Sequence, residues 1–276
     1  MKPAGFAYHA PDDLDHALDL LAELGDDAKV LAGGQSLVPI LALRLARFDH
    51  LVDLNRIGVL RGVERADGAL VVRAMTRQRA MERVDDVPLL ARATPLIGHF
   101  QIRNRGTVGG SLAHADPASE YPAVALALDA DLELASRRGR RSVPASEFFQ
   151  STWTTTADPD EVLVAARFPR WEGRAGFAVE EVARRHGDFA LAGAVCAYEP
   201  GARAAIALFG VAPTAVRAPA AEKAMLAGVP ADEVAHEAVR DLQPADDVHA
   251  SSATRVRLAR AVVRRAVTGA REEAGA

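Results

Sequence analysis

Two short glycine-rich segments constrain this sequence more than any other feature. The first reads Ala-Gly-Gly-Gln-Ser at residues 32–36, and the second reads Thr-Val-Gly-Gly-Ser at residues 107–111. Glycine lets a backbone approach a ligand closely and adopt φ values that other residues avoid. Successive N–H groups of such a segment can converge on an anion and form a phosphate-binding nest. Two nests suit the two charges of a pyrophosphate, so the sequence predicts a dinucleotide site.

The usual nucleotide-binding motifs are missing from both segments. Neither reads Gly-x-Gly-x-x-Gly, the strand-to-helix fingerprint of the doubly wound nucleotide fold. Neither reads Gly-x-x-x-x-Gly-Lys-Ser/Thr, so neither is a P-loop. Gly-Gly is also a common turn dipeptide, and ordinary tight turns are therefore the alternative interpretation of both segments.

The composition bounds what the rest of the chain can do. A length of 276 residues exceeds what one compact core usually holds and predicts two domains. The formal net charge of −4 gives no general attraction toward nucleic acid. The single cysteine, Cys196, allows neither an intrachain disulfide nor a cysteine-ligated iron–sulfur cluster in this chain. The sequence has no signal-peptide pattern and no membrane-length apolar run, so a cytoplasmic protein without a membrane span is expected.

Hydrophobic periodicity divides the chain into three parts. The first is a small βαβ-like unit, with strands at 29–31 and 50–54, a helix that starts within 11–15 and stops at Gly25, and a helix at 38–47. The second has a loop at the second glycine segment, strands at 70–74, 131–135 and 161–168, and helices at 77–83, 89–97 and 120–128. After a boundary at 171–176, the third has strands at 177–183, 190–198 and 204–211, then helices at 219–227, 231–241 and 254–270. Strands followed by helices predict an α+β layer for this last part.

Four stretches of the sequence match a known pattern. They are the first glycine segment, the second in its longer form Thr-Val-Gly-Gly-Ser-Leu-Ala-His-Ala-Asp-Pro-Ala-Ser-Glu at 107–120, Arg-Arg-His-Gly-Asp-Phe-Ala at 184–190, and residues 247–255. In this order they resemble the FAD-binding medium subunit of molybdenum hydroxylases, the family of carbon monoxide dehydrogenase and xanthine dehydrogenase. The resemblance covers essentially the whole chain.

The resemblance implies a fold of the α+β class. It consists of a two-subdomain FAD-binding α/β domain of the PCMH-type, followed by a small α+β C-terminal flavin domain. The FAD-binding domain is expected at residues 1–174, with subdomains of about 1–56 and 57–174 that clasp FAD between them. The C-terminal domain of the molybdenum hydroxylase flavoprotein subunit is expected at residues 175–276.

The resemblance also implies cofactor-binding roles for residues that match the family's motifs. The first segment is expected to line the pyrophosphate and ribityl chain, and the second to hold the same pyrophosphate from the other subdomain. The residues expected to bind FAD are Lys29, Val30, Leu31, Ala32, Gly33, Gly34, Gln35, Ser36, Ile97, Thr107, Val108, Gly109, Gly110, Ser111, Asp116, Glu120, Leu163 and Asp188.

Several of these residues also fit a plainer role. Core packing accounts equally well for Ile97 and Leu163. Glu120 fits an acid in the first turn of a helix, and Asp116 fits an N-cap. Asp188 is expected to organise a turn near the flavin, with or without a direct contact.

The chemistry of the chain is expected to belong to its cofactor. No acid–base pair, nucleophile dyad or metal-ligand cluster can be assembled from the sequence, so neither catalytic nor metal-binding residues are predicted. The resemblance implies noncovalent FAD here, with the molybdenum cofactor in a large partner subunit and [2Fe-2S] clusters in a small one. Electrons would pass from those clusters through FAD to an external acceptor, in a dimer of heterotrimers. A stand-alone flavin oxidoreductase and a noncatalytic assembly subunit without flavin are the alternatives.

Overall fold

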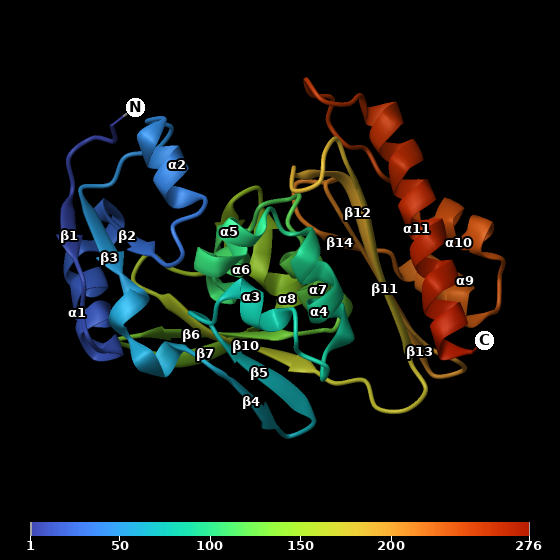
Figure 1. Cartoon of the computed structure of the whole chain (residues 1–276), viewed down its shortest axis with the longest axis horizontal. Coiled ribbons are helices and arrows are strands. Elements are labelled where there is room, and N and C mark those ends of the chain that lie inside the picture. The colour runs from blue at the N-terminus through green and yellow to red at the C-terminus, as the bar shows by residue number, and fades with distance from the viewer. Residues whose placement is uncertain (1, 276) are drawn as a thin grey trace.

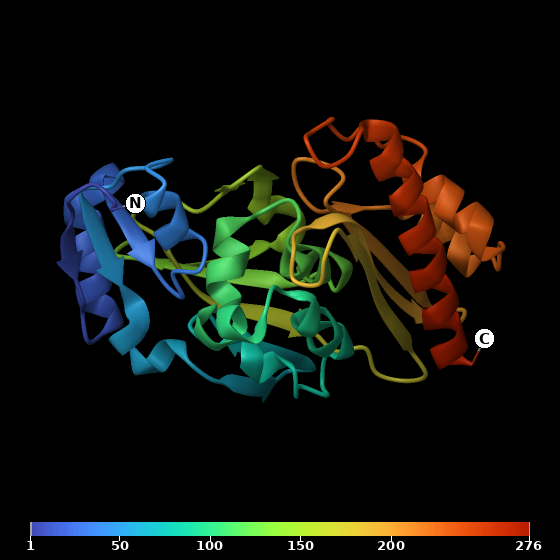
Figure 2. The same cartoon turned by 45° about the horizontal axis from the view of Figure 1, so that its top comes forward.

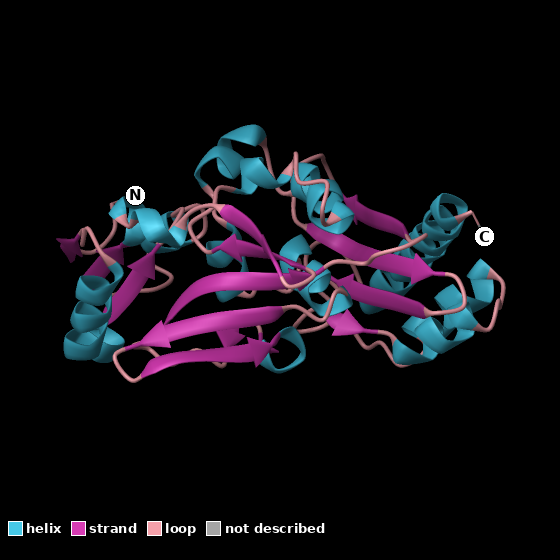
Figure 3. Cartoon of the chain, turned by 90° about the horizontal axis from the view of Figure 1, so that it is seen from below, coloured by secondary structure: helices cyan, strands magenta, loops and turns pink. Residues whose placement is uncertain are grey.

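Three β-sheets follow one another along the long axis of the molecule (Figure 1). The structure is a computed structural model that describes residues 2–275. The sheets hold three, five and four strands, and a separate two-stranded hairpin accompanies them. Helices fill the space between the second and third sheets, and further helices cover the outer face of the third (Figure 2). Figure 3 shows the same arrangement from below, with the sheets in a row.

The first sheet is parallel, with strand order β1-β3-β2. Its elements are β1 (Ala7–His9), α1 (Leu14–Leu24), β2 (Ala28–Leu31), α2 (Leu37–Ala42) and β3 (His50–Asp53). The first glycine segment leaves the carboxyl end of β2 and leads directly into α2. Ligands of open α/β sheets bind outside the carboxyl ends of the strands. The predicted βαβ-like unit therefore presents its glycine segment where such a fold binds ligands.

The second sheet is antiparallel, with strand order β4-β5-β10-β6-β7. Its strands are β4 (Val63–Ala66), β5 (Ala69–Arg73), β6 (Asp131–Ser136), β7 (Gly139–Pro144) and β10 (Val162–Pro169). The helices of this part are α3 (Gln78–Met81), α4 (Pro88–Ala93), α5 (Phe100–Arg105), α6 (Val108–His114), α7 (Glu120–Ala127) and α8 (Ala145–Phe148), and its hairpin strands are β8 (Phe149–Ser151) and β9 (Thr154–Thr155).

The third sheet is an antiparallel meander with strand order β11-β12-β13-β14. Its strands are β11 (Gly176–Ala183), β12 (Ala190–Glu199), β13 (Arg203–Phe209) and β14 (Val216–Arg217). The helices α9 (Pro219–Leu226), α10 (Ala231–Val239) and α11 (Ser252–Ala274) then cover its outer face (Figure 1). This order of strands then helices agrees with the layer predicted from the sequence.

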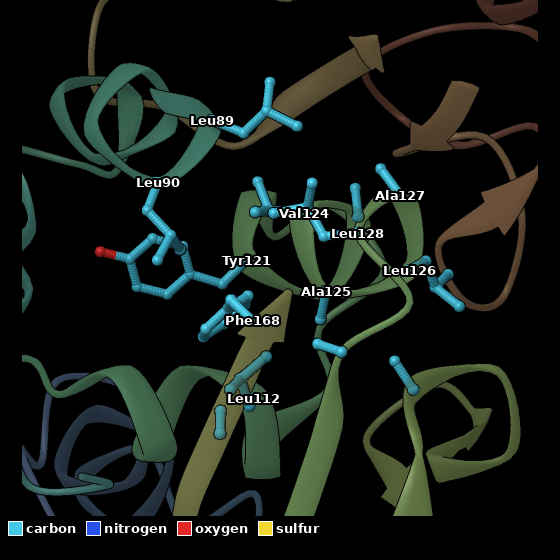
Figure 4. Packing of buried hydrophobic residues seen from close by; sticks show 14 of the residues in the cluster. Leu89, Leu90, Leu112, Tyr121, Val124, Ala125, Leu126, Ala127, Leu128 and Phe168 are labelled. Atoms are coloured by element: carbon cyan, nitrogen blue, oxygen red, sulfur yellow. The ribbon is translucent and has the colours of Figure 1, made fainter. Parts of the chain in front are cut away.

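The helix α7 joins the second and third sheets into one core. All eight of its residues are buried, as expected for a helix that is apolar on every side. Around it, Leu112 and Phe168 of the second part and Phe209 of the third belong to the same apolar cluster. Figure 4 shows Tyr121 between Leu90 and Phe168, with the other side chains of the helix directed to both sides. The position of Glu120, the first residue of α7, is therefore fixed by both sheets.

Several predicted boundaries were wrong for local reasons. The helix predicted at 38–47 ends at Ala42, and Arg44 behind it adopts a φ of +58°. The helix predicted at 89–97 ends as an α-helix at Ala93 and continues only as a 3₁₀ turn, because Pro95 has no N–H to donate. The second glycine segment, predicted to be a loop, forms the first turn of α6.

Candidate functional site

The first glycine segment has backbone N–H groups that the protein leaves unused. Among residues 2–275, no acceptor is bonded to the N–H of Gly33, Gly34, Gln35 or Ser36. Gly34 has a φ of +74°, in the left-handed region that favours glycine. The Gln35 side chain donates to the Gly33 carbonyl at 3.1 Å, which holds the turn without occupying an amide. This is the donor arrangement that an anion-binding nest requires.

A cavity of about 350 Å³ opens beside these amides. The first segment forms one side of it, and Asp53, Asn55 and Arg105 form part of the other. The Asn55 amide group donates to the Ala32 carbonyl at 2.7 Å and so ties the end of β3 to the glycine segment. Burial, and then the neighbouring Arg61 and Arg105, lower the pKa of Arg77. The cavity thus lies beside a concentration of positive charge, which favours an anionic ligand.

The second glycine segment uses its backbone N–H groups internally. The N–H of Val108 donates to the Thr76 carbonyl at 3.0 Å, and that of Gly109 donates to the Ala74 carbonyl at 2.8 Å. The Thr107 side chain caps α6 by accepting from the Gly110 N–H at 3.0 Å. The Ser111 N–H donates to the Thr107 carbonyl at 3.1 Å. The expectation of a second nest from these four amides was therefore wrong.

The two segments nevertheless lie against each other. A Cβ on Gly33 would stand 2.5 Å from the Arg105 carbonyl oxygen and 2.7 Å from the Gly106 Cα. A Cβ on Gly110 would stand 3.3 Å from the Ala32 Cβ. Glycine is needed at these positions because the backbones of two sheets meet there. The seam between the first and second parts of the chain therefore runs along both predicted segments.

The residues after the second segment are tied to one another. The hydroxyls of Ser111 and Ser119 lie 3.0 Å apart. One carboxylate oxygen of Asp116 accepts from the Ala118 N–H at 2.9 Å and the other from the Trp153 indole N–H at 3.1 Å. Asp116 thus forms an Asx-turn before α7, while Ser119 occupies the N-cap position. The plainer alternative for Asp116, that it is the N-cap of the helix, was therefore wrong.

Glu120 is a buried carboxyl at the start of α7. Its exposed fraction is 8%, and its side chain accepts no hydrogen bond from another residue in the described part of the chain. Burial, followed by the charge of Glu181, raises the pKa of Glu120 to about 8. Burial also raises the pKa of Glu181, on β11, to about 7. Both carboxyls thus lack the donors that a buried acceptor needs.

The turn between β11 and β12 brings Asp188 toward the second part of the chain. The Asp188 N–H donates to the Arg185 carbonyl at 3.1 Å, so the residue organises a turn as predicted. Its Oδ2 is buried without a hydrogen-bond partner. The intervening Gly187 has a φ of +86°, and a Cβ on it would meet the His99 ring at 2.6 Å. This turn is packed against the chain just before α5.

The other predicted residues lie in the surrounding framework. Ile97 follows the 3₁₀ turn after α4 and packs against the apolar cluster around α7. Leu163 is a buried member of that cluster on β10. Lys29 is exposed on β2, with its Nζ 5.7 Å from the centre of the Phe48 ring, and Val30 and Leu31 complete the strand before the glycine segment.

Two sets of groups fit a cofactor with a diphosphate and a polyol: the free amides at the seam, and the carboxyls of Glu120 and Glu181 where the second and third sheets meet. Unbonded N–H groups beside a cavity suit phosphate oxygens, and buried carboxyls without partners suit hydroxyl groups. Residues 4–171 match the family model described as the FAD binding domain in molybdopterin dehydrogenase. Residues 177–270 match the model of the CO dehydrogenase flavoprotein C-terminal domain. The chain belongs to this family.

Solved structures support the same assignment over the whole chain. Carbon monoxide dehydrogenase from Hydrogenophaga pseudoflava contains a chain that is 40% identical, with a TM-score of 0.95 and 99% coverage of both chains. Quinoline 2-oxidoreductase from Pseudomonas putida 86 matches at 36% identity and a TM-score of 0.92, over 99% of both chains. The α+β fold inferred from the resemblance is confirmed.

A further relative carries the name of another dehydrogenase complex. The 6-hydroxypseudooxynicotine dehydrogenase complex subunit alpha of Paenarthrobacter nicotinovorans is 40% identical, over 98% of this chain and 96% of the relative. The inferred family, its FAD cofactor and its place among oxidoreductase subunits are confirmed. Between residues 2 and 275, no helix is both long and apolar enough to cross a membrane.

Sequence reasoning missed Asn55 and Arg105 at the seam, and Glu181 on the face of the third sheet that is directed toward the second part. A signal existed for Asn55, because it follows the second parallel strand as the glycine segment follows the first. Arg105 precedes the second segment by two positions, but an arginine beside a glycine segment does not by itself indicate that it lines a cavity. Glu181 lies on the far side of the predicted domain boundary, and nothing in its local sequence indicated which face of the strand it occupies.

Proposed function

We propose that this chain is the FAD-carrying electron-transfer subunit of a molybdenum hydroxylase complex. The observation that carries the proposal is the row of unbonded N–H groups from Gly33 to Ser36, of which residues 33–35 line a cavity at the seam of two sheets. This row lies in the segment that the FAD-binding family model covers. Bound FAD supplies one- and two-electron redox chemistry, for which the protein provides position and electrostatics.

The first segment is assigned to the diphosphate. The amides of residues 33–36 would hold its oxygens, and the Arg105 guanidinium would add positive charge at the rim of the cavity. The approach to this diphosphate site would be lined by Ala32 and by the strand residues before it, Lys29, Val30 and Leu31. Because the turn at Gly34 needs a positive φ, a side chain there would strain the cradle itself.

The second part of the chain is assigned to the opposite side of the cofactor. The Ser111 hydroxyl and the Thr107 N–H are polar groups that the second segment would offer to the cofactor, while Val108, Gly109 and Gly110 act through their close packing. Glu120 would accept hydrogen bonds from ribityl hydroxyls. Ile97 and Leu163 would contact the rings of the cofactor, and Asp116 and Asp188 would hold the turns beside them. Binding is noncovalent in this proposal.

The partners follow from the division of cofactors within the family. Electrons would arrive from [2Fe-2S] clusters of a small subunit and leave to an external acceptor, and the molybdenum cofactor would lie in a large subunit. One cysteine cannot supply the four thiolates that such a cluster usually needs. A dimer of heterotrimers in the cytoplasm, without nucleic acid, is the assembly we propose. The predicted limits of the FAD-binding domain and its subdomains, with boundaries near 56 and 174, belong to the same proposal.

Purification of the tagged full-length chain from its own host tests this function. We expect a yellow preparation with flavin absorbance, together with a cysteine-rich small chain and a large chain. Denaturation in acid should release FAD into solution, as noncovalent binding requires. A folded, colourless chain that does not bind added FAD would contradict the proposal and favour an assembly subunit. A yellow chain that purifies alone and oxidises an organic substrate would favour a stand-alone flavin oxidoreductase.

A further inference from the structure

Two adjacent glutamates on β11 have opposite environments. Glu180 accepts from the Arg265 guanidinium of α11 at 2.7 Å, on the outer face of the third sheet. Successive residues of a strand point to opposite faces, so Glu181 is directed toward the second part of the chain. Its Oε2 is buried there and has no hydrogen-bond partner. A buried oxygen of this kind indicates a donor that the chain itself does not supply.

Glu120 lies on the other side of the interface that Glu181 faces. It begins α7, which packs between the second and third sheets, and it is the charge of Glu181 that most affects the ionisation of Glu120 after burial. Within residues 2–275, neither carboxylate forms an ion pair with an arginine, lysine or histidine. The fold therefore directs two acceptor groups into one interface. Neither has a cation to balance its charge, and when both are ionised neither can donate a hydrogen bond to the other.

Hydroxyl groups are the donors that suit such a pair. Each hydroxyl offers one O–H, and a carboxylate oxygen accepts it with a short, strong hydrogen bond. A polyol chain lying between the two carboxyls would satisfy both without bringing a charge into the interface. The ribityl chain of FAD and the ribose of its adenylate half both provide such hydroxyls.

We infer that Glu181 is a further cofactor-contacting residue, which accepts hydrogen bonds from the ribityl chain opposite Glu120. This inference rests on the proposed function, because it places Glu181 in the same FAD site. It makes the C-terminal part of the chain a direct contributor to that site. The flavin is thus held from both sides of the interface on which α7 lies.

Equilibrium binding of FAD, FMN and ADP to the flavin-free full-length chain tests the inference. For Glu181→Ala we expect the dissociation constants of FAD and FMN to rise by about tenfold or more, as for loss of a charged acceptor. The dissociation constant of ADP should stay unchanged, because ADP lacks the ribityl chain. Glu180→Gln is the matched control, since it alters the adjacent carboxyl on the opposite face, and all three affinities should remain as in the wild type.

The outcomes distinguish this inference from the function on which it rests. A wild-type chain that binds no FAD would contradict the proposed function itself. If the wild type binds FAD and the folded Glu181→Ala variant binds it equally well, Glu181 is not a contact. An equal loss for FAD and ADP would place the residue at the adenylate half and overturn the ribityl assignment. Glu181→Gln keeps the side-chain volume and one acceptor oxygen, and it provides the same comparison, with a smaller loss, if the alanine variant does not fold.

Discussion

The two glycine segments are alike in sequence and different in physical role. In the first, the N–H groups of residues 33–36 remain unbonded beside a cavity, and Gly34 needs its positive φ. In the second, the N–H groups of residues 108–111 are bonded within the protein, and the glycines allow α6 to pack closely on β5. A Gly-Gly pair therefore indicates that other atoms come close to its backbone. Only the hydrogen bonding of its amides shows whether those atoms belong to a ligand or to the protein itself.

The difference arises from what precedes each pair. The first segment leaves a parallel strand and turns before α2 begins, so its amides take part neither in the strand pairing nor in the helix. The second is preceded by Thr107, whose side chain caps α6 and starts the helix at once. The first N–H groups of a helix need partners outside it, and here the carbonyls of Thr76 and Ala74 and the side chain of Thr107 bind those of residues 108–110.

The largest expected effect is the loss of packing in Gly109→Ala. The new Cβ would stand 2.4 Å from the Ala74 Cβ and 2.7 Å from its Cα, so the backbone of α6 or β5 must move. We expect the free energy of unfolding to fall by about 3 kcal/mol, as for an overpacked core. Urea unfolding of the flavin-free chain measures this change. Gly269→Ala in α11 is the control, since its Cβ meets nothing closer than 3.6 Å. A Gly109→Ala variant as stable as that control would mean that close packing against Ala74 does not require glycine in the second segment.

Glu120→Gln tests whether the buried carboxyl that follows the second segment makes the stability of the chain depend on pH. The pKa of Glu120 is raised from 4.5 to about 8 in the folded chain, so its protonated form is favoured by folding. Its contribution to stability is complete below pH 4.5 and is lost as the pH rises toward 8, with a slope of at most about 1.4 kcal/mol per pH unit.

The measurement is the stability of the flavin-free chain at pH 5 and pH 8. Glutamine stays neutral, so Glu120→Gln should gain stability relative to the wild type at pH 8 and little at pH 5. Glu181 titrates in the same direction and remains in both proteins. An equal difference between variant and wild type at both pH values would contradict a raised pKa for Glu120.

Gly34→Ala separates backbone strain from ligand binding. A residue with a side chain costs about 1–2 kcal/mol in the left-handed region, and the Cβ would also lie 3.2 Å from Val38 Cγ2. Gly68→Ala is a matched control, because its φ is +72° and no atom lies within 4 Å of its Cβ. Both variants should lose similar stability, while only Gly34→Ala should bind FAD about tenfold more weakly. Equal FAD affinities in the two variants would remove the first segment from the site.

The smallest expected effect belongs to the cap of α6. Thr107→Val keeps the shape of the side chain and removes the oxygen that accepts from the Gly110 N–H. We expect a loss of about 1 kcal/mol in stability with unchanged FAD affinity, and recovery of stability in Thr107→Ser. Thermal unfolding and fluorescence titration measure the two quantities. A large loss of FAD affinity without loss of stability would show that Thr107 serves the ligand.

The sequence predicted those parts of the fold in which a local pattern decides the structure. The strands β2 and β3 and the C-terminal strands β11, β12 and β13 follow apolar runs, and they form where predicted, whereas the two-residue β14 was not predicted. β1 is only three residues long and largely exposed, so it has no such pattern. α6 was missed because glycine is a poor helix former, and tertiary contacts with Ala74 override that preference.

The candidate site could be predicted only in part for a similar reason. The first segment stands at the end of a strand and is recognisable from its own residues. Arg105 reaches the cavity because its backbone packs on Gly33, a contact between residues far apart in the chain. The charge of Glu181 acts on Glu120 only because α7 packs between the second and third sheets. Local patterns carry no information on such contacts.

Amide hydrogen exchange of the full-length chain with and without FAD tests the central claim most directly. The claim is that FAD is held by the unbonded amides of the first segment and not by those of the second. We predict fast exchange at residues 33–36 without FAD and strong protection when FAD is added, while the amides of residues 108–111 exchange slowly in both states. FAD that binds without protecting residues 33–36, or that newly protects only residues 108–111, would contradict the account.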